Sequence, residues 1–473
     1  MISVSDTFRN FFTTLGNCFT IPELRSRLFF TMVLLAVTRL VAIIPVPGLD
    51  GEILANAFQE LREKEAKTEG GPSLLGLYSL FTGGALERCG LASLGIMPYI
   101  SATIILQLMT AVMPGLSKLA REEGGRTKIV QYGRYLTVLL CLGQGFVMAM
   151  GWENPEKVFQ GLKLDGELVR DPGLWYRIQT MLMLTTGTLL LMWLGEQITE
   201  RGVGNGVSLV ITTGILARAD QAIGEFLGMF FGDTATHGGF FAIMLLAMLL
   251  AVVAGVIAMT QAQRKIPVQY AQRTKGGKMY QGGSSFMPLR VNYAGVMPII
   301  FAQAILMFPQ AIFQFLAGVF TTGTFLNDAF STLALKLNYG SPWFLVLEGL
   351  MILFFSYFWV ATQFNERQIA DDLKKYGGYI PGIRPGDATM NFLHHAMSRI
   401  TLAGAIFLMV IAIIPTILNN WMNIPFSVAT FFGGTSVLIS VGVMLDTMRQ
   451  IESHLMMRHY DGFLGKGKVR GRS

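Results

Sequence analysis

The sequence predicts an all-α integral membrane protein whose ten transmembrane helices form two inverted halves of five helices each. The first reason is composition, because 52% of the 473 residues are hydrophobic and only 14% are charged, whereas soluble proteins carry about 25% charged residues. The second is a series of apolar stretches of about 20 residues, the length that a helix needs to cross the hydrocarbon core. The third is the distribution of charge among the segments between these stretches.

Ten apolar segments follow one another along the chain, and we predict that each crosses the membrane. They fall into two groups of five. Because five is odd, the second group starts on the opposite side of the membrane from the first, and such inverted halves usually meet at a pathway near the midplane. The predicted spans are residues 28–46, 93–113, 129–150, 174–194, 203–221, 240–261, 293–316, 343–362, 399–418 and 430–446.

The spans divide the chain into five parts. A cytoplasmic N-terminal segment precedes the first half, an external hinge connection separates the halves, and a basic cytoplasmic tail follows the second half. In that order, the five parts are residues 1–27, 28–221, 222–239, 240–446 and 447–473.

Charge in the connections predicts the orientation. Residues 45–72 hold three Lys or Arg against six Asp or Glu, and residues 151–173 hold three against five, whereas residues 262–291 hold six Lys or Arg and no acid. Loops rich in Lys and Arg stay in the cytoplasm. We therefore place the first two connections outside, the third inside, and both termini in the cytoplasm.

Two cytoplasmic loops are too long to be simple turns, and long loops in compact proteins are usually functional. Residues 262–291 have period-2 stretches around a Lys-Gly-Gly-Lys turn, which predicts a hairpin that protrudes into water. Residues 363–398 predict a short amphipathic helix, a Gly/Pro-rich tip and a second helix. A basic loop beside a membrane can bind anionic lipid, RNA or an acidic protein surface.

An external segment, Ser73–Gly90, is apolar but too short to span, and Gly83-Gly84 interrupts it. Two interpretations stay open on composition alone. The segment is either an interfacial half-helix or a re-entrant piece, and irregular backbone at membrane depth is tolerated only where it is buried in protein or lines a cavity.

The sequence gives little support for catalysis or for a cofactor site. The adjacent His394 and His395 do not share a helix face as metal ligands would, the three cysteines are far apart, and no known nucleophile or phosphate-binding motif occurs. We see no mid-span acid of the kind that a solute transporter uses, and we expect Arg39 and Arg134 to extend toward the membrane surfaces. The sequence therefore predicts neither an enzyme, nor a metal or cofactor site, nor a transporter.

Two stretches carry the most specific signal: GIMPYISATIILQLMT (Gly95–Thr110) and MWLGEQITERGVGNGVSLVI (Met192–Ile211). Both resemble signature stretches of the SecY family of translocon subunits, of the bacterial or plastid type. The resemblance runs in one order over essentially the whole chain, through VPGLDGEIL, FTGGAL, QRKIPVQYAQRTKGGKMY, PLRVNYAGVMPIIFA, ADDLKKYGGYIPGIRPGDAT and PFSVATFFGGTSVLISVGVMLD.

The resemblance implies two pseudo-symmetric halves around a central pore that conducts unfolded polypeptides. A ring of apolar side chains would line the constriction, since such a ring excludes water and ions yet deforms around a passing chain. The implied ring is Ile96, Ile100, Ile211, Ile300 and Ile439. The re-entrant segment near 73–84 would be a plug that closes the outer side, with the positions Ser73, Leu74, Leu75, Leu80, Phe81, Thr82, Gly83 and Gly84.

The resemblance also implies a lateral gate between the second and seventh spans, where transmembrane segments leave for the lipid. Ser101, Gln107 and Asn292 match polar positions there. We expect a polar bond across this seam to hold the gate shut, and an apolar signal peptide to shift the population toward the open state.

Partners follow from the same resemblance. The ribosome and the motor ATPase SecA would dock on the cytoplasmic loops, the small membrane subunits SecE and SecG would accompany the chain, and signal peptides, nascent chains and membrane lipids would contact it. The implied docking residues are Arg264, Lys265, Arg273, Lys275, Lys278 and Arg384. The expected location is the bacterial cytoplasmic membrane, with the plastid thylakoid membrane as the alternative.

Overall fold

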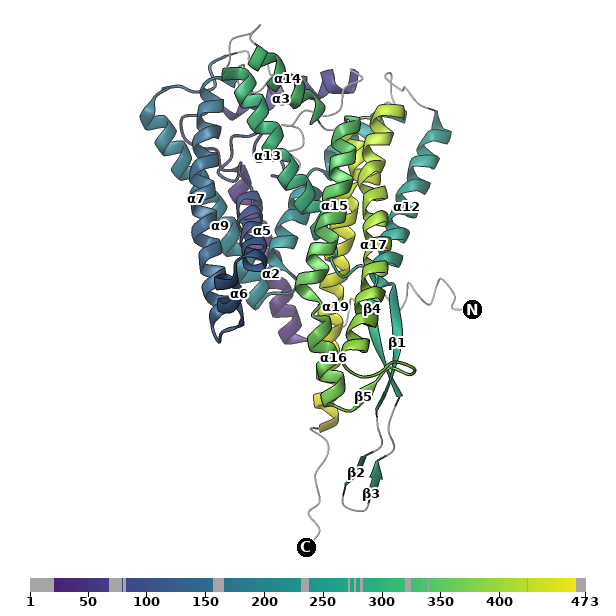
Figure 1. Cartoon of the computed structure of the whole chain (residues 1–473). Coiled ribbons are helices and arrows are strands. Elements are labelled where there is room, and N and C mark those ends of the chain that lie inside the picture. The colour runs from purple at the N-terminus through teal and green to yellow at the C-terminus, as the bar shows by residue number, and fades with distance from the viewer. Residues whose placement is uncertain are drawn as a thin grey trace.

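The computed structural model is a bundle of long helices that carries two small antiparallel sheets at one end (Figure 1). The residues that it describes are 21–67, 79, 82–155, 166–230, 238–270, 273–275, 278–280, 284–319, 325–338, 340–422 and 424–464.

Within the described residues, seven helical segments are long and apolar enough to cross a membrane. An eighth is the pair α5 (Met97–Val112) and α6 (Pro114–Arg121), which is bent by 104° at its break. The chain is therefore a multi-pass membrane protein. The seven segments comprise α2 (Pro22–Ile43), α7 (Gly125–Glu153), α9 (Leu174–Arg201), α12 (Gly239–Gln261), α15 (Pro342–Gln363), α17 (Asp387–Met422), and α18 (Phe426–Gly433) with α19 (Thr435–Leu464).

Helices occupy the ten predicted spans, but the fifth and the tenth are each divided between two helices, the tenth at Gly434. Residues 203–221 are not one helix, because α10 (Gly206–Leu216) has 11 residues and a turn separates it from α11 (Ala219–Phe230). An 11-residue helix rises only about 16 Å. The helix α11 also enters the predicted external connection, 222–239. The seventh predicted span corresponds to α13 (Met297–Val319).

The helices pack in two groups that follow the chain order (Figure 1). In the first, α7 packs on α5 and α9, and α2 and α10 pack on α9. In the second, α15 packs on α13 and α17, while α12 packs on α18 and α19. The groups touch where α10 meets α19 and where α13 meets α5. The contact between the halves therefore runs through the middle of the bundle.

Two helices that the sequence analysis left unassigned cover the end opposite the sheets: α3 (Gly51–Lys67) and α14 (Phe325–Lys336) (Figure 1). Helix α3 has most of its charged residues from Glu60 onward, and its first half buries Leu54 and Phe58 in a cluster with Trp152 of α7. A helix that buries one apolar stripe is stable at a membrane surface, because its polar face stays in water.

The two long loops that we predict to be cytoplasmic form antiparallel strands and the predicted helix–tip–helix. Strand β1 (Gln263–Tyr270) pairs antiparallel with β4 (Ser284–Arg290), and β2 (Arg273–Lys275) pairs antiparallel with β3 (Lys278–Tyr280). The second loop forms α16 (Glu366–Lys375) and the start of α17. Its strand β5 (Gly378–Tyr379) pairs with β1, so that the two loops share one sheet.

Candidate functional site

The five isoleucines of the predicted ring lie in one hydrophobic cluster at the contact between the two halves. Each is between 1% and 6% exposed. They come from four elements: the start of α5, α10, α13 and α19. Residues that are far apart along the chain thus meet at the centre of the bundle. The five are Ile96, Ile100, Ile211, Ile300 and Ile439.

Helix breaks place these side chains. Pro98 stands in the first turn of α5, where its missing N–H costs nothing. The Asn205 side chain caps α10 by accepting a hydrogen bond from the Ser208 amide at 3.2 Å. The break between α18 and α19 falls at Gly434, one turn before Ile439. Because each ring residue lies near the start of a helix or just after a break, the backbone can bring it to the centre.

The described part of the predicted plug lies against α10 and shares a cavity with two ring residues. Gly83 has a φ of +62°, and a Cβ built on it would lie 2.8 Å from the Cα of Gly214 in α10. A cavity of about 30 Å³ lies at this contact, lined by Arg39, Thr82, Ile96, Ile211 and others. Such a volume holds about one water molecule. Ser73, Leu74, Leu75, Leu80 and Phe81 lie outside the described residues.

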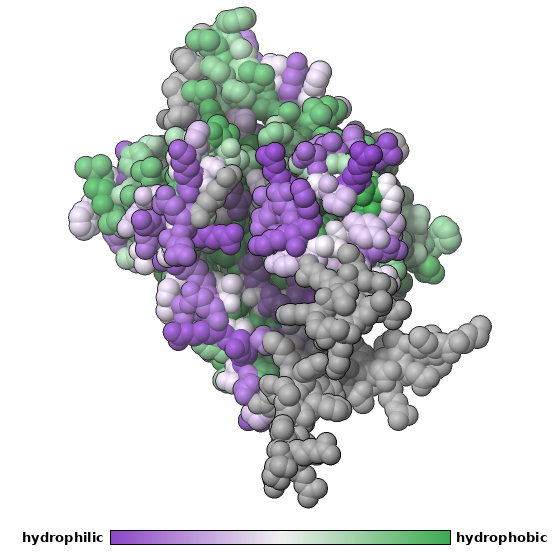
Figure 2. Space-filling model, turned by 60° about the horizontal axis from the view of Figure 1, so that its bottom comes forward, coloured by the Kyte–Doolittle hydropathy of each residue, from purple (hydrophilic) through white to green (hydrophobic). Residues whose placement is uncertain are grey.

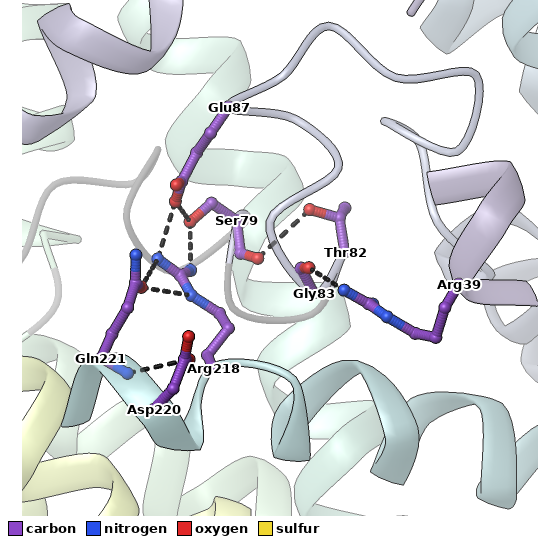
Figure 3. Close-up of polar contacts among 8 residues, drawn as sticks. All are labelled: Arg39, Ser79, Thr82, Gly83, Glu87, Arg218, Asp220 and Gln221. Carbon is purple, nitrogen blue, oxygen red and sulfur yellow. Dashed lines mark hydrogen bonds and ion pairs between the residues drawn. The ribbon is translucent and has the colours of Figure 1, made fainter. Parts of the chain in front are cut away.

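The sequence analysis expected Arg39 to extend toward the membrane surface, but its side chain binds the predicted plug instead. Its Nη2 donates to the carbonyl of Gly83 at 3.0 Å (Figure 3). Arg134 forms a two-bond ion pair with Glu196 at 2.8 and 3.1 Å and keeps 44% of its side chain exposed, so its extension toward the membrane surface stays a prediction. No sequence spacing shows either partner, because Gly83 and Glu196 lie 44 and 62 residues away along the chain.

A polar cluster that the sequence analysis missed binds the turn at residues 82–90, which contains Gly83, together with Ser79 just before it. Arg218 donates to Ser79 Oγ and, at 2.7 Å, to Glu87 Oε1, and the Ser79 hydroxyl donates to the same carboxylate oxygen at 2.7 Å (Figure 3). The only signal in the sequence was that Arg218 stands near the end of an apolar segment. Its two partners lie 139 and 131 residues away along the chain.

The predicted gate helices α5 and α13 pack against each other, but among the described side chains no hydrogen bond joins Gln107 to Asn292. The Asn292 side chain donates to the carbonyl of Gly295 at 3.0 Å, within the turn that leads into α13. The side-chain oxygen of Gln107 is buried without a hydrogen-bond partner, and Ser101 is buried. The Asn292 side-chain amide therefore bonds within its own turn, whereas the prediction had it bond across the contact between α5 and α13.

The predicted docking residues gather at the sheet end of the molecule. Arg264 and Lys265 are exposed on β1, and Arg384 is exposed in the tip between α16 and α17. Arg273, Lys275 and Lys278 lie on β2 and β3, and their side chains are outside the described residues. Figure 2 shows hydrophilic side chains gathered in the middle of this face. Pairing of β1 with β5 brings the two loops together.

The glycine-rich stretch 202–206 joins helices of both halves. Its backbone amides are bound at 2.8 to 3.0 Å by the side chains of Thr31 in α2, Thr199 in α9 and Gln450 in α19. These bonds satisfy backbone amides that no helix hydrogen bond satisfies. The glycine-rich stretch therefore forms a junction at which α2, α9 and α19 meet.

One acid lies inside a span, contrary to the expectation that none does. Glu348 of α15 is 1% exposed, and its Oε1 accepts a hydrogen bond from Gln303 Nε2 of α13 at 3.3 Å. A single buried acid with an amide partner is not a proton relay, which needs a chain of titratable groups. Among the described residues, no group of three or more His, Cys, Asp or Glu could hold a metal ion.

Comparison with known proteins places this geometry in a family. The family model described as SecY matches residues 90–448, more than half of the chain. The protein translocase subunit SecY of Thermotoga maritima is 41% identical over 460 residues, which cover 96% of this chain and 98% of the relative. The chain belongs to the SecY family.

Two further comparisons agree with this family. The SecY subunit of Escherichia coli K12 is 40% identical over 453 residues, covering 95% of this chain and 96% of the relative. A solved structure of a protein conducting channel aligns with a TM-score of 0.59 at 17% identity, covering 90% of this chain and 91% of that one. Sec61 in a canine ribosome-channel complex aligns with a TM-score of 0.56. The predicted fold class, a helical SecY-type channel, is therefore confirmed.

Proposed function

We propose that this chain is the channel-forming subunit of a protein translocase. It passes unfolded secretory polypeptides across the membrane and releases transmembrane segments sideways into the bilayer. The observation that carries the proposal is the central cluster of five isoleucines, drawn from both halves and buried together. Branched apolar side chains at a constriction exclude water and ions and bind no sequence strongly, so that chains of any sequence can pass.

The plug near 73–84 closes the outer side of this constriction. Support comes from Gly83, which lies against Gly214 of α10, and from its neighbour Thr82, which lines one cavity with Ile96 and Ile211. A segment seated there blocks the pathway and has to leave before a polypeptide can pass.

The lateral gate lies between α5 and α13, which carry ring residues and touch each other along the seam between the halves. An apolar signal peptide competes for this seam by partitioning between the two helices. The opening is a population shift, because the signal peptide binds the open seam more strongly than the closed one. The buried, unpartnered side-chain oxygen of Gln107 makes the closed seam easier to separate.

The cytoplasmic loops are the docking platform for the ribosome and for SecA, with Arg264, Lys265 and Arg384 as exposed contacts. Basic loops attract ribosomal RNA phosphates. SecE and SecG accompany the chain in a bacterial cytoplasmic membrane, and both termini lie in the cytoplasm. The chain itself performs no chemistry and holds no cofactor.

Photocrosslinking at Ile300 tests the proposal. The full chain, co-purified with its accompanying membrane subunits, carries a photoreactive residue at Ile300, and a secretory precursor is stalled halfway. Ile312 is the matched control, since it lies on the same helix but is 53% exposed against 4% for Ile300. We expect an adduct to the precursor at Ile300 only, lost when the precursor lacks its signal peptide. Active translocation with no adduct at Ile300, Ile96 or Ile439 would overturn the pore assignment.

A further inference from the structure

The turn at residues 82–90, which includes the last three residues of the predicted plug, is tied to the first half of the molecule. The amide of Val46 donates to the carbonyl of Cys89, and the amide of Leu91 donates to the carbonyl of Ile44, both at 2.8 Å. Arg39 of α2 adds its bond to Gly83. These bonds join the turn to α2 and to the residues just after it, so the turn moves with the first half.

Arg218 reaches this turn from the junction between α10 and α11. Its amide donates to the carbonyl of Ile215 in α10 at 3.1 Å, and its carbonyl accepts a hydrogen bond from the Ala222 amide of α11 at 3.2 Å. Helix α10 packs on α9 of the first half, whereas α11 packs on α18 of the second, where the rings of Phe226 and Phe432 stack with centroids 4.7 Å apart. Arg218 therefore lies at a junction between the halves, joined to the first through α10 and to the second through α11.

The bonds of Arg218 to the turn are shielded from solvent. The side chains of Arg218 and Glu87 are 14% and 12% exposed, and Glu87 Oε1 accepts from both Arg218 and Ser79 (Figure 3). Gln221 Oε1 also accepts from Arg218, at 3.3 and 3.4 Å, which aims the guanidinium at the turn. A largely desolvated ion pair is costly to break by removing one partner, because the other charge stays behind without compensation.

We infer that Arg218 and Glu87 form a latch that couples seating of the plug to contact between the two halves. The inference rests on the proposed channel function. When the halves separate, α11 follows α18, the junction between α10 and α11 bends, and Arg218 is withdrawn from Glu87 and Ser79, which releases one end of the turn. Arg39 keeps the other end on the first half. Separation of the halves and release of the plug are then two parts of one transition, and each favours the other.

The latch sets how often the resting channel opens. A bond present only in the closed state raises the closed-to-open ratio, and its loss lowers that ratio by the same factor. For a mostly buried ion pair we expect loss of one partner to raise the resting open fraction about tenfold or more. Arg218 and Glu87 are positioning residues, since they act on the plug and do not touch the polypeptide.

Resting ion conductance measures the latch directly. The full chain with its accompanying membrane subunits is reconstituted in planar bilayers, and the open fraction is recorded without precursor. We expect Arg218→Ala and Glu87→Gln each to raise it about tenfold or more. Arg218→Lys keeps the charge but loses the planar fork that reaches both partners, so an intermediate leak is expected. The double exchange Glu87→Arg with Arg218→Glu restores the pair and lowers the leak again.

Asp220→Asn is the matched control. Asp220 is exposed in the first turn of α11, and its carboxylate accepts from the Gln221 amide at 2.8 Å, so its loss leaves the open fraction unchanged. Assembly of each variant with its subunits confirms that it folds. A wild-type leak in both Arg218→Ala and Glu87→Gln, or a double exchange that leaks as much as either single variant, overturns the latch. A stalled precursor that induces no conductance in the unmodified chain overturns the channel function instead, so the two failures are distinct.

Discussion

Gly83 is restricted by two separate features of its surroundings. Its φ of +62° lies in the left-handed region, which side chains disfavour by about 1 kcal/mol or more. A Cβ there would also lie 2.6 Å from Arg39 Nη1 and 2.8 Å from the Cα of Gly214. Gly84 has a similar φ of +82°, but nothing lies within 4 Å of its Cβ position. Substituting Gly84 tests backbone strain alone, whereas substituting Gly83 tests backbone strain together with steric overlap.

We expect Gly83→Ala to loosen the turn more than Gly84→Ala does. Cys89 is the reporter, since it is fully buried in the same turn, and burial raises the pKa of its thiol to about 12, with Asp50 adding to the shift. A neutral, buried thiol reacts slowly with maleimide. In a Cys18→Ser, Cys141→Ala background, labelling of Cys89 should accelerate about tenfold or more in Gly83→Ala, from the added overlap cost. Equal rates in the two variants would show that strain alone matters.

Helix α9 lies against the backbone of the turn at Gly187. A Cβ on this residue would lie 2.1 Å from the carbonyl oxygen of Leu91, which is backbone and cannot rotate away. Small residues let membrane helices approach their neighbours closely. Gly187 therefore sets how closely α9 can approach this turn. From composition alone, it is only one of many glycines that let membrane helices pack closely.

Gly187→Ala should push α9 away from the turn and destabilise the protein by about 2 kcal/mol, within the range for overpacked cores. Gly143→Ala on α7 is the control, since nothing lies within 4 Å of its Cβ position, and alanine favours a helix by about 1 kcal/mol over glycine. Thermal unfolding of the detergent-solubilised complex should therefore shift down for the first variant and stay level or rise for the second. A lower midpoint for Gly143→Ala with no change for Gly187→Ala contradicts the packing argument.

At the scale of the whole molecule, the strands that carry Arg264 and Lys265 lie at one end of the bundle, while α3 and α14 cover the other end (Figure 1). Arg264 and Lys265 are exposed there, so removing them costs little folding stability. Surface cations act on a polyanion through release of counterions, which makes their contribution dependent on salt.

The double variant Arg264→Ala, Lys265→Ala should weaken ribosome binding about tenfold near physiological salt and flatten its dependence on salt concentration. Co-sedimentation of the reconstituted complex with ribosomes at several salt concentrations measures both. Arg170→Ala is the control, because Arg170 is exposed in a connection that we predict to be external. Loss of binding in the control, or an unchanged salt slope in the double variant, argues against docking on this loop.

Local sequence determined much of this architecture. Apolar length gives the positions of the spans, because a helix inside lipid has to satisfy its own backbone and cover itself with apolar side chains. The Lys-Gly-Gly-Lys turn gives the hairpin, since turn chemistry is local. The resemblance named the five isoleucines, and the structure brings them together.

The contacts between distant segments were decided only by the tertiary structure. Arg218 and Glu87, Arg39 and Gly83, and β1 and β5 are pairs whose members lie far apart along the chain. Each depends on how whole helices pack, and a carboxylate or a carbonyl carries no local mark of the partner that it will meet. The same holds for α10, whose short length follows from its cap at Asn205 and the turn at Arg218. Spacing and composition record what each segment prefers, while packing selects which segments meet.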